Sequence, residues 1–159
     1  MTIITYKGWE FAVDRQLTEE TYQGVLNGGA DACGCDNCKN YVASRESIFP
    51  NEVKALFQSL GMDYRKEVEI ASYDVSPEGF DDIAGWFHFK GQLLAGQDCH
   101  VPTPGGGYTF RLEAIEGNFS IGFSPGNDLT FFEVKAGLVQ VEFETTIPWI
   151  IDKPLPGIG

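Results

Sequence analysis

The pattern of apolar residues changes near Glu67 from a helical repeat to a repeat of two, and this change most constrains the fold. Before it, the clearest element is a helix over residues 51–60, with Asn51 as its N-cap and Gly61 as its left-handed end. Its apolar residues recur at the spacing of one helix face and are Val53, Leu56, Phe57 and Leu60. After it, short alternating runs separated by Pro and Gly are typical of antiparallel strands. The sequence therefore predicts an α+β fold in one domain over residues 1–159, with N-terminal helices and a cysteine knuckle packed on a curved antiparallel sheet, either a sandwich or a half-barrel.

The other expected elements follow from caps, turns and alternation. Residues 2–6 and 9–13 predict a hairpin, Thr18 is expected to cap a helix to about residue 26, and a further helix is expected over about 36–49. In the last strand, Gln140, Glu142 and Glu144 alternate with apolar residues, which predicts a solvent-exposed face. Residues 148–159 are expected to form an extended tail. The later strands are expected at 67–73, 83–90, 92–94, 108–115, 119–123, 129–134 and 138–145.

The chain is strongly acidic, with 11 Lys and Arg against 23 Asp and Glu, which gives a formal net charge of −12 at pH 7. Such a charge repels phosphates and anionic lipid headgroups, so the expected partner is a basic protein rather than nucleic acid or a membrane surface. No apolar run approaches the roughly 18 residues of a membrane span. The first residues show no pattern of a signal peptide, so we expect a cytoplasmic protein.

Three of the four cysteines, Cys33, Cys35 and Cys38, lie within six residues, and Gly34 between them allows a tight turn. Three thiols at this spacing can converge on one zinc ion. Cys99 as the fourth ligand would give an all-sulfur site, whereas His100 or His88 would give three sulfurs and one nitrogen. Cys38 is expected in the first turn of a helix, where a thiolate is favoured, so a redox or nucleophilic thiol is an alternative. Reduced cysteines without a ligand are another alternative, and a disulfide framework is disfavoured.

Two patterns resemble catalytic sites without supplying the chemistry. Residues 122–126 match the G-x-S-x-G motif of serine hydrolases, but Pro125 has no N–H to donate to an oxyanion, and a strand rather than a helix is expected next. We therefore expect Ser124 to end a strand. Alternation places His88 on the sheet face opposite Phe87 and Phe89, where ordinary hydrogen bonds are a better explanation than a ligand or a general base.

The motif Cys-Gly-Cys-Asp-Asn-Cys-Lys-Asn-Tyr at residues 33–41, followed by Phe49-Pro50 and the helix that ends in Leu-Gly-Met-Asp at residues 60–63, resembles a family of small uncharacterised bacterial proteins. The motif of that family reads C-x-C-x-x-C-x-N-[YF]. The resemblance implies a bacterial cytoplasmic protein with the cysteine motif as its signature, and it implies no catalytic role for any residue.

These observations lead to one hypothesis and two alternatives. The hypothesis is a non-catalytic binding protein in which zinc at the cysteine motif pins the helical segment to the sheet. The first alternative is an acidic inhibitor, of the immunity-protein type, of a basic toxin or nuclease. The second is a thiol-dependent enzyme that uses Cys35 or Cys38.

Overall fold

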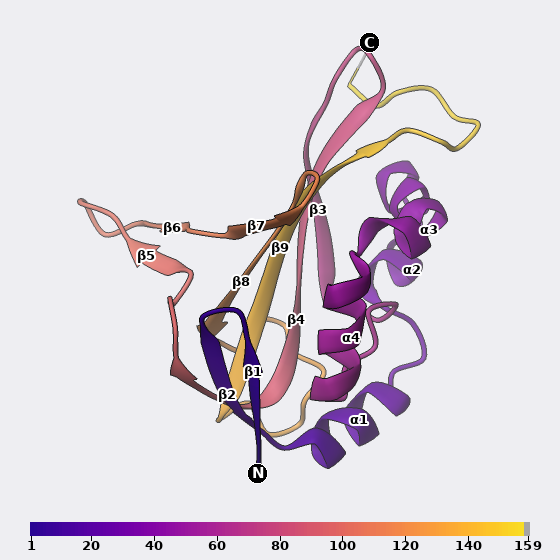
Figure 1. Cartoon of the computed structure of the whole chain (residues 1–159). Coiled ribbons are helices and arrows are strands. Elements are labelled where there is room, and N and C mark those ends of the chain that lie inside the picture. Colours follow the sequence, from indigo (N-terminus) through magenta and orange to yellow (C-terminus); the bar gives the residue numbers. More distant parts are fainter. Residues whose placement is uncertain (158–159) are drawn as a thin grey trace.

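The computed structural model describes residues 1–157 and has the predicted α+β fold (Figure 1). Seven strands form one antiparallel sheet in the order β1-β2-β4-β9-β8-β7, and β3 pairs with β4. The helices lie on one side of this twisted sheet, which is a single layer rather than a sandwich. Its strands are β1 (Thr2–Tyr6), β2 (Trp9–Val13), β3 (Glu69–Val75), β4 (Phe80–Ala95), β7 (Glu113–Glu116), β8 (Phe119–Pro125) and β9 (Leu138–Pro148). Two further strands, β5 (His100–Pro102) and β6 (Tyr108–Phe110), pair with each other and project from the body (Figure 1).

The core lies between the helices and the sheet and is rich in phenylalanine. Phe49 is at its centre, since its ring lies 5.1 Å from that of Phe143, 5.5 Å from that of Phe119 and 6.0 Å from those of Phe57 and Phe87. Aromatic rings at these separations bury large apolar areas in edge-to-face and tilted arrangements. The helices that close this core are α1 (Arg15–Gln23), α2 (Gly29–Cys33), α3 (Asp36–Ile48) and α4 (Asn51–Leu60).

Helix α4 confirms the sequence prediction almost residue by residue. Gly61 ends it in the left-handed conformation, with φ of 84°. The N-cap is Pro50 rather than Asn51, which is the first helical residue. Proline at this position fixes φ near the helical value without removing a bond of the helix, because the first N–H groups have no intrahelical partner. All four residues predicted for its apolar face are buried, namely Val53, Leu56, Phe57 and Leu60.

Helix α1 begins four residues earlier than predicted and ends at Gln23. Asp14 caps it, since its carboxylate accepts a hydrogen bond of 3.1 Å from the backbone N–H of Leu17. Thr18, predicted to be the cap, is instead inside the helix and fully buried. Its hydroxyl donates to the carbonyl of Asp14 at 2.8 Å and accepts from the backbone N–H of Lys90 in β4 at 3.0 Å. The sequence pattern that predicts Thr18 as an N-cap therefore belongs to a buried threonine whose hydroxyl bonds to the sheet.

Strand β4 is one element of 16 residues, whereas the sequence suggested two strands, 83–90 and 92–94. It pairs with β2 at one end and β3 at the other, and along its opposite edge with β9. Gly91, which lies between the two expected strands, is required because the neighbouring strand approaches closely. A Cβ there would lie 2.0 Å from the carbonyl oxygen of Ala12.

Three other expectations about the second half are wrong. Residues 129–134 form a loop, in which Phe132 is buried with its ring 6.4 Å from that of Tyr22. The run 108–115 is divided between β6 and β7. The outer face of β9 is only partly solvent-exposed, because Gln140 and Glu142 are buried, whereas Glu144 is exposed as predicted. Burial therefore explains Phe132, whereas Leu129 and Val134 in the same loop are exposed.

The expected tail begins later than predicted, because β9 continues to Pro148. Two hydrogen bonds hold the next two residues. The backbone N–H of Trp149 donates to the carbonyl of Gly79 at 2.8 Å, and that of Ile150 donates to the side chain of Asn40 at 2.7 Å. The last two residues of the predicted tail, 158–159, lie outside the described residues.

Candidate metal centre

The structure brings together the three clustered cysteines at the junction of α2 and α3. Cys33 is the last residue of α2, Cys35 is the N-cap of α3, and Cys38 lies in the first turn of α3. Gly34 makes the turn between the helices with φ of 75°, a value that favours glycine. The three Sγ atoms lie within 4.8 Å of one another. This convergence, which the sequence spacing predicts, gives the donor set of a thiolate metal site.

The environment of the three thiols divides them into two kinds. Cys33 is exposed, and hydrogen bonds from the backbone of Cys35 and from the neighbouring thiols lower its pKa. Cys38 is buried. Its burial is the main cause that raises its pKa, and the neighbouring thiols of Cys33 and Cys35 raise it further. This direction is opposite to the one expected for Cys38 from its place in the first turn of the helix. The backbone N–H of Cys38 also donates to the Sγ of Cys35 at 3.4 Å, a contact that stabilises sulfur ligands.

The side chain of Asn37, inside the motif, anchors the cysteine segment to the sheet. Its amide donates to the hydroxyl of Ser72 in β3 at 3.0 Å and to the carboxylate of Asp81 in β4 at 3.4 Å. Ser72 in turn donates to the other oxygen of Asp81 at 2.5 Å. Asp81 is fully buried, and this burial raises its pKa. The motif is thus attached to two strands by hydrogen bonds that involve none of the sulfurs.

A second anchor, which sequence reasoning missed, holds the start of α2. Glu67 is fully buried, and its Oε1 accepts a hydrogen bond of 3.0 Å from the backbone N–H of Ala30. Arg45 lies 3.6 Å from the other carboxylate oxygen of Glu67 and 2.9 Å from Asp31 in α2. Burial raises the pKa of Glu67 to about 7. A buried charge of this kind persists only with partners, so α2, α3 and the segment before β3 are tied together here.

The double glycine at the start of α2 is the feature of the sequence that indicates this anchor. In the structure, a Cβ at Gly29 would lie 2.1 Å from the carbonyl oxygen of Val68, and one at Gly28 would lie 2.8 Å from Oε1 of Glu67. The two glycines therefore allow the backbone to approach residues 67 and 68.

None of the residues predicted as a fourth ligand joins the three cysteines, because the only group of converging ligand atoms in the described part of the chain is Cys33, Cys35 and Cys38. Strand β5, which begins at His100, lies on the other side of the molecule from α2 and α3 (Figure 1). His100 is exposed and stacks on Tyr108 with ring centroids 4.3 Å apart. Cys99 is buried. Its burial, together with the smaller effect of the charge of Glu142, raises the pKa of Cys99 to about 12. The prediction that Cys99 or His100 completes the site is therefore corrected.

His88 belongs to a buried polar network on the sheet face away from the helices. Its Nε2 lies 3.0 Å from Oε1 of Gln140, whose amide donates to Glu142 at 2.5 Å. The same oxygen of Gln140 accepts from the backbone N–H of Asp128 at 3.1 Å, and the carbonyl of Asp128 accepts from the indole of Trp86 at 2.9 Å. The loop after β8 thus covers Gln140 and Glu142, which were expected to be exposed to solvent. The prediction that His88 is held by ordinary hydrogen bonds is consistent with this network.

Ser124 lies two strands from His88 on this face, and Gln140 of β9 is the register partner of both. Its hydroxyl reaches only the carbonyl of Pro125, at 3.5 Å, and β8 ends there without a following helix. A nucleophilic serine needs a base within hydrogen-bond reach and a donor for the oxyanion. The geometry supplies neither, in agreement with the sequence interpretation.

The network predicts a pH dependence of stability that belongs to Glu142. Burial raises the pKa of Glu142 from 4.5 to about 7. The hydrogen bond from Gln140 lowers this pKa, and the charges of Asp128 and Glu144 raise it. The folded protein therefore binds this proton more tightly than the unfolded chain, and the contribution to stability is lost as the pH rises from about 4.5 to about 7. We expect Glu142→Gln to remove this loss, up to about 3 kcal/mol between pH 5 and pH 8.

Urea unfolding of the wild type and of Glu142→Gln at both pH values measures this difference. Burial lowers the pKa of His88, which favours unfolding on acidification, but both proteins keep His88 and its effect cancels in the comparison. Parallel pH profiles for the two proteins would show that Glu142 is not responsible.

Comparison with protein-family models, curated proteins and solved structures gives no match for this chain. The resemblance to a bacterial family therefore stays a prediction. In the described part of the chain, no helix combines the length and the hydropathy needed to cross a membrane.

Proposed function

We propose that this protein is a non-catalytic binding protein that holds one zinc ion through Cys33, Cys35 and Cys38. The observation that carries the proposal is the convergence of the three Sγ atoms within 4.8 Å. Thiolates are soft ligands that suit zinc, and zinc accepts four ligands in a tetrahedron without a preference from its d electrons. Because Cys33 and Cys35 are exposed, a water molecule can supply the fourth ligand.

The surroundings of the three cysteines favour a non-catalytic role. A catalytic zinc needs a cleft that orients a substrate and excludes water from it. Cys33 and Cys35 are exposed at a helix junction instead. The exposed position suits a structural ion, or an ion offered to a partner, better than it suits an active site.

The role of the ion differs from the hypothesis that zinc pins the helices to the sheet. All three ligands come from residues 33–38, so the ion would close only this short segment. Contacts with the sheet are made by Asn37, and contacts with the segment before β3 are made through Glu67. We therefore propose that zinc fixes only the α2–α3 junction. The polar contacts of Asn37 and Glu67 hold the two helices on the rest of the fold.

Metal analysis of the purified protein tests the proposal. Protein prepared without chelator is expected to contain about one zinc per chain, and Cys38→Ser is expected to contain almost none. Cys99→Ser is the matched control, because Cys99 is also a buried cysteine but lies outside the cluster, and it should keep its zinc. A metal-free wild type, with three freely titratable thiols in the folded state, would refute the proposal.

A further inference from the structure

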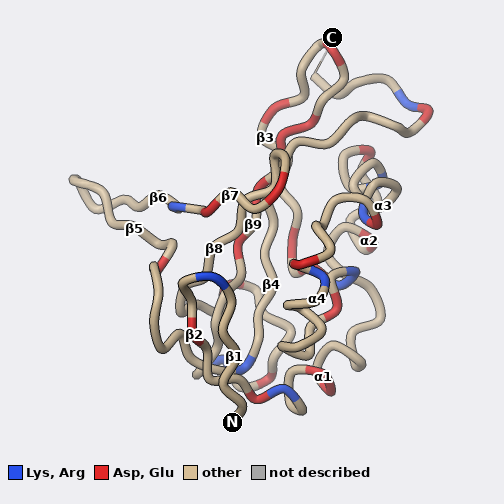
Figure 2. The backbone as a smooth tube through the Cα atoms, in the orientation of Figure 1, with Lys and Arg blue, Asp and Glu red and all other residues tan. Residues whose placement is uncertain are grey.

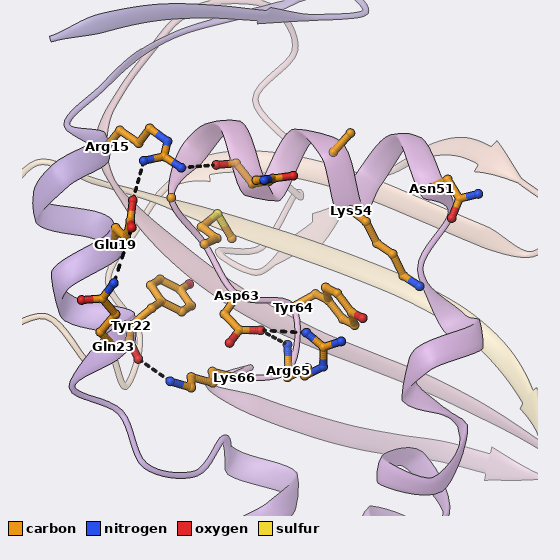
Figure 3. A pocket seen from close by; sticks show the side chains of 14 residues that line it. Arg15, Glu19, Tyr22, Gln23, Asn51, Lys54, Asp63, Tyr64, Arg65 and Lys66 are labelled. Atoms are coloured by element: carbon orange, nitrogen blue, oxygen red, sulfur yellow. Dashed lines mark hydrogen bonds and ion pairs between the residues drawn. The ribbon is translucent and has the colours of Figure 1, made fainter.

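A groove between α1, α4 and the turn that follows α4 is separate from the cysteine site (Figure 3). Its volume is about 590 Å³, which lies within the range of small-molecule sites. Helix α1 forms one wall with Tyr22, helix α4 forms another with Lys54, and residues 61–66 close it below. The groove is therefore built from three segments that the fold holds in fixed positions.

The charge of this groove is opposite to that of the whole chain. Four of the 11 basic residues line it, together with only two acidic ones, Glu19 and Asp63. Acidic residues occur along most of the chain, whereas the basic ones are few (Figure 2). On a protein with a net charge of −12, a local excess of positive charge selects for anions, because anions are repelled elsewhere on the surface. The four basic residues are Arg15, Lys54, Arg65 and Lys66.

The two arginines that line the groove already bond to other groups of the protein. Arg15 forms an ion pair with Glu19 and donates to the carbonyl of Gln58 at 3.2 Å, which joins α1 to α4. Arg65 forms two hydrogen bonds with the carboxylate of Glu46, at 2.7 Å and 3.2 Å. A paired guanidinium has little charge left for a ligand, so these residues fix the shape of the groove.

The two lysines keep their charge for a ligand, since neither has a carboxylate oxygen within 4.0 Å among the residues that the structure describes. The ammonium of Lys54 donates to the carbonyl of Glu46 at 2.7 Å, and that of Lys66 donates to the carbonyl of Tyr22 at 2.7 Å. Each ammonium has three donors, so these bonds position it and leave further donors.

The remaining lining combines apolar residues with the amide side chains of Gln23, Asn51 and Gln58. Tyr22 and Met62 are buried, and the hydroxyl of Tyr22 is engaged with the carbonyl of His88 at 2.7 Å, so its ring is the part left for the groove. The ring of Tyr64 lies 5.0 Å from the ammonium of Lys54. An apolar or aromatic body can therefore pack here while its anionic group reaches a lysine.

We infer that this groove binds a small organic anion with an apolar body and one negative charge, such as an aromatic carboxylate or sulfonate. Lys54 and Lys66 supply the charge complement, and Tyr22, Met62 and Tyr64 supply the apolar contacts. Asp63 also lines the groove and opposes a second negative charge on the ligand, so polyanions are disfavoured.

Titration with 2-naphthalenesulfonate, followed by ¹⁵N–¹H NMR of the whole chain, tests this inference. We expect shifts confined to α1, α4 and residues 61–66, and affinity at least about tenfold higher than for the neutral analogue 2-naphthalenemethanol, since charge-assisted hydrogen bonds contribute this much. The affinity of the sulfonate should fall as salt is added.

Two variants and one control locate the site. Lys54→Met and Lys66→Met keep most of the aliphatic side chain and remove the charge, and each is expected to weaken sulfonate binding about tenfold. Lys39→Met, on the exposed surface of α3 and outside the groove, should bind as the wild type does. Unchanged affinity in both groove variants, equal affinity for the neutral analogue, shifts elsewhere, or no shift at millimolar sulfonate would each overturn the inference.

Discussion

Replacing Phe57 with alanine is expected to lower the free energy of unfolding by about 3 to 5 kcal/mol. The side chain is only 1% exposed, and its ring lies 4.9 Å from that of Phe87 in β4 and 6.0 Å from that of Phe49. Alanine would remove the apolar contacts and leave a cavity between α4 and the sheet. The rigid aromatic neighbours cannot collapse fully into the space, so both effects contribute.

Urea denaturation of Phe57→Ala beside Gln58→Ala measures this effect with a neighbouring control. The side chain of Gln58 is exposed, and its backbone carbonyl, which accepts from Arg15 and from the N–H of Gly61, is kept in the alanine variant. Gln58→Ala should therefore change the stability by less than about 0.5 kcal/mol. Equal midpoints for the two variants would mean that the helix face is assigned wrongly.

Replacing Cys38 with serine is expected to lower the affinity for zinc by about a hundredfold or more. Structural zinc sites with four ligands contribute about 10 to 16 kcal/mol, so the loss of one thiolate costs about 3 kcal/mol. Cys38 is also the buried member of the three, and its substitution removes the sulfur that lies deepest in the site. Competition with a fluorescent zinc chelator measures the affinity.

Asn37→Ala separates the ligands from the contacts that position them. It keeps all three thiols but removes the bonds to Ser72 and Asp81, so we expect zinc affinity to fall by about tenfold, which is less than for Cys38→Ser. Cys99→Ser should have no effect. If Cys38→Ser binds zinc as tightly as the wild type, the assignment of Cys38 as a ligand is wrong.

The sequence predicts those parts of this fold that depend on nearby residues. Helix α4 carries its apolar face, its start and its glycine end within about ten residues, so its burial follows from the pattern alone. The first hairpin is confirmed for the same reason, with Tyr6 opposite Trp9. The convergence of Cys33, Cys35 and Cys38 is local as well, because Gly34 and the start of α3 determine it.

The parts that were missed depend on residues far apart in the chain. In the sequence, Glu67 belongs to the alternating run expected as the strand 67–73, and only its contacts with Ala30 and Arg45 explain its burial. The alternation of β9 is correct, but alternation does not show that the loop at Asp128 covers Gln140 and Glu142. In each case a polar residue is buried with a distant partner, which no local pattern reveals.

The prediction of a fourth ligand failed for a similar reason. Cysteine and histidine at residues 99 and 100 have suitable chemistry, but the position of β5 depends on the path of the whole sheet. Cys99 instead packs beside Gly122, where an added Cβ would lie 2.6 Å from that of Cys99. The type of residue is therefore insufficient to assign a ligand without the topology.

X-ray absorption at the zinc edge of the metal-loaded protein tests the zinc proposal most directly, because it counts the sulfur ligands. The three-cysteine site predicts three sulfurs at about 2.3 Å and one lighter ligand, oxygen or nitrogen, at about 2.0 to 2.2 Å. Cys99→Ser should give the same spectrum. A shell of four sulfurs that becomes three in Cys99→Ser, or a shell of oxygen and nitrogen alone, would contradict the site described for Cys33, Cys35 and Cys38.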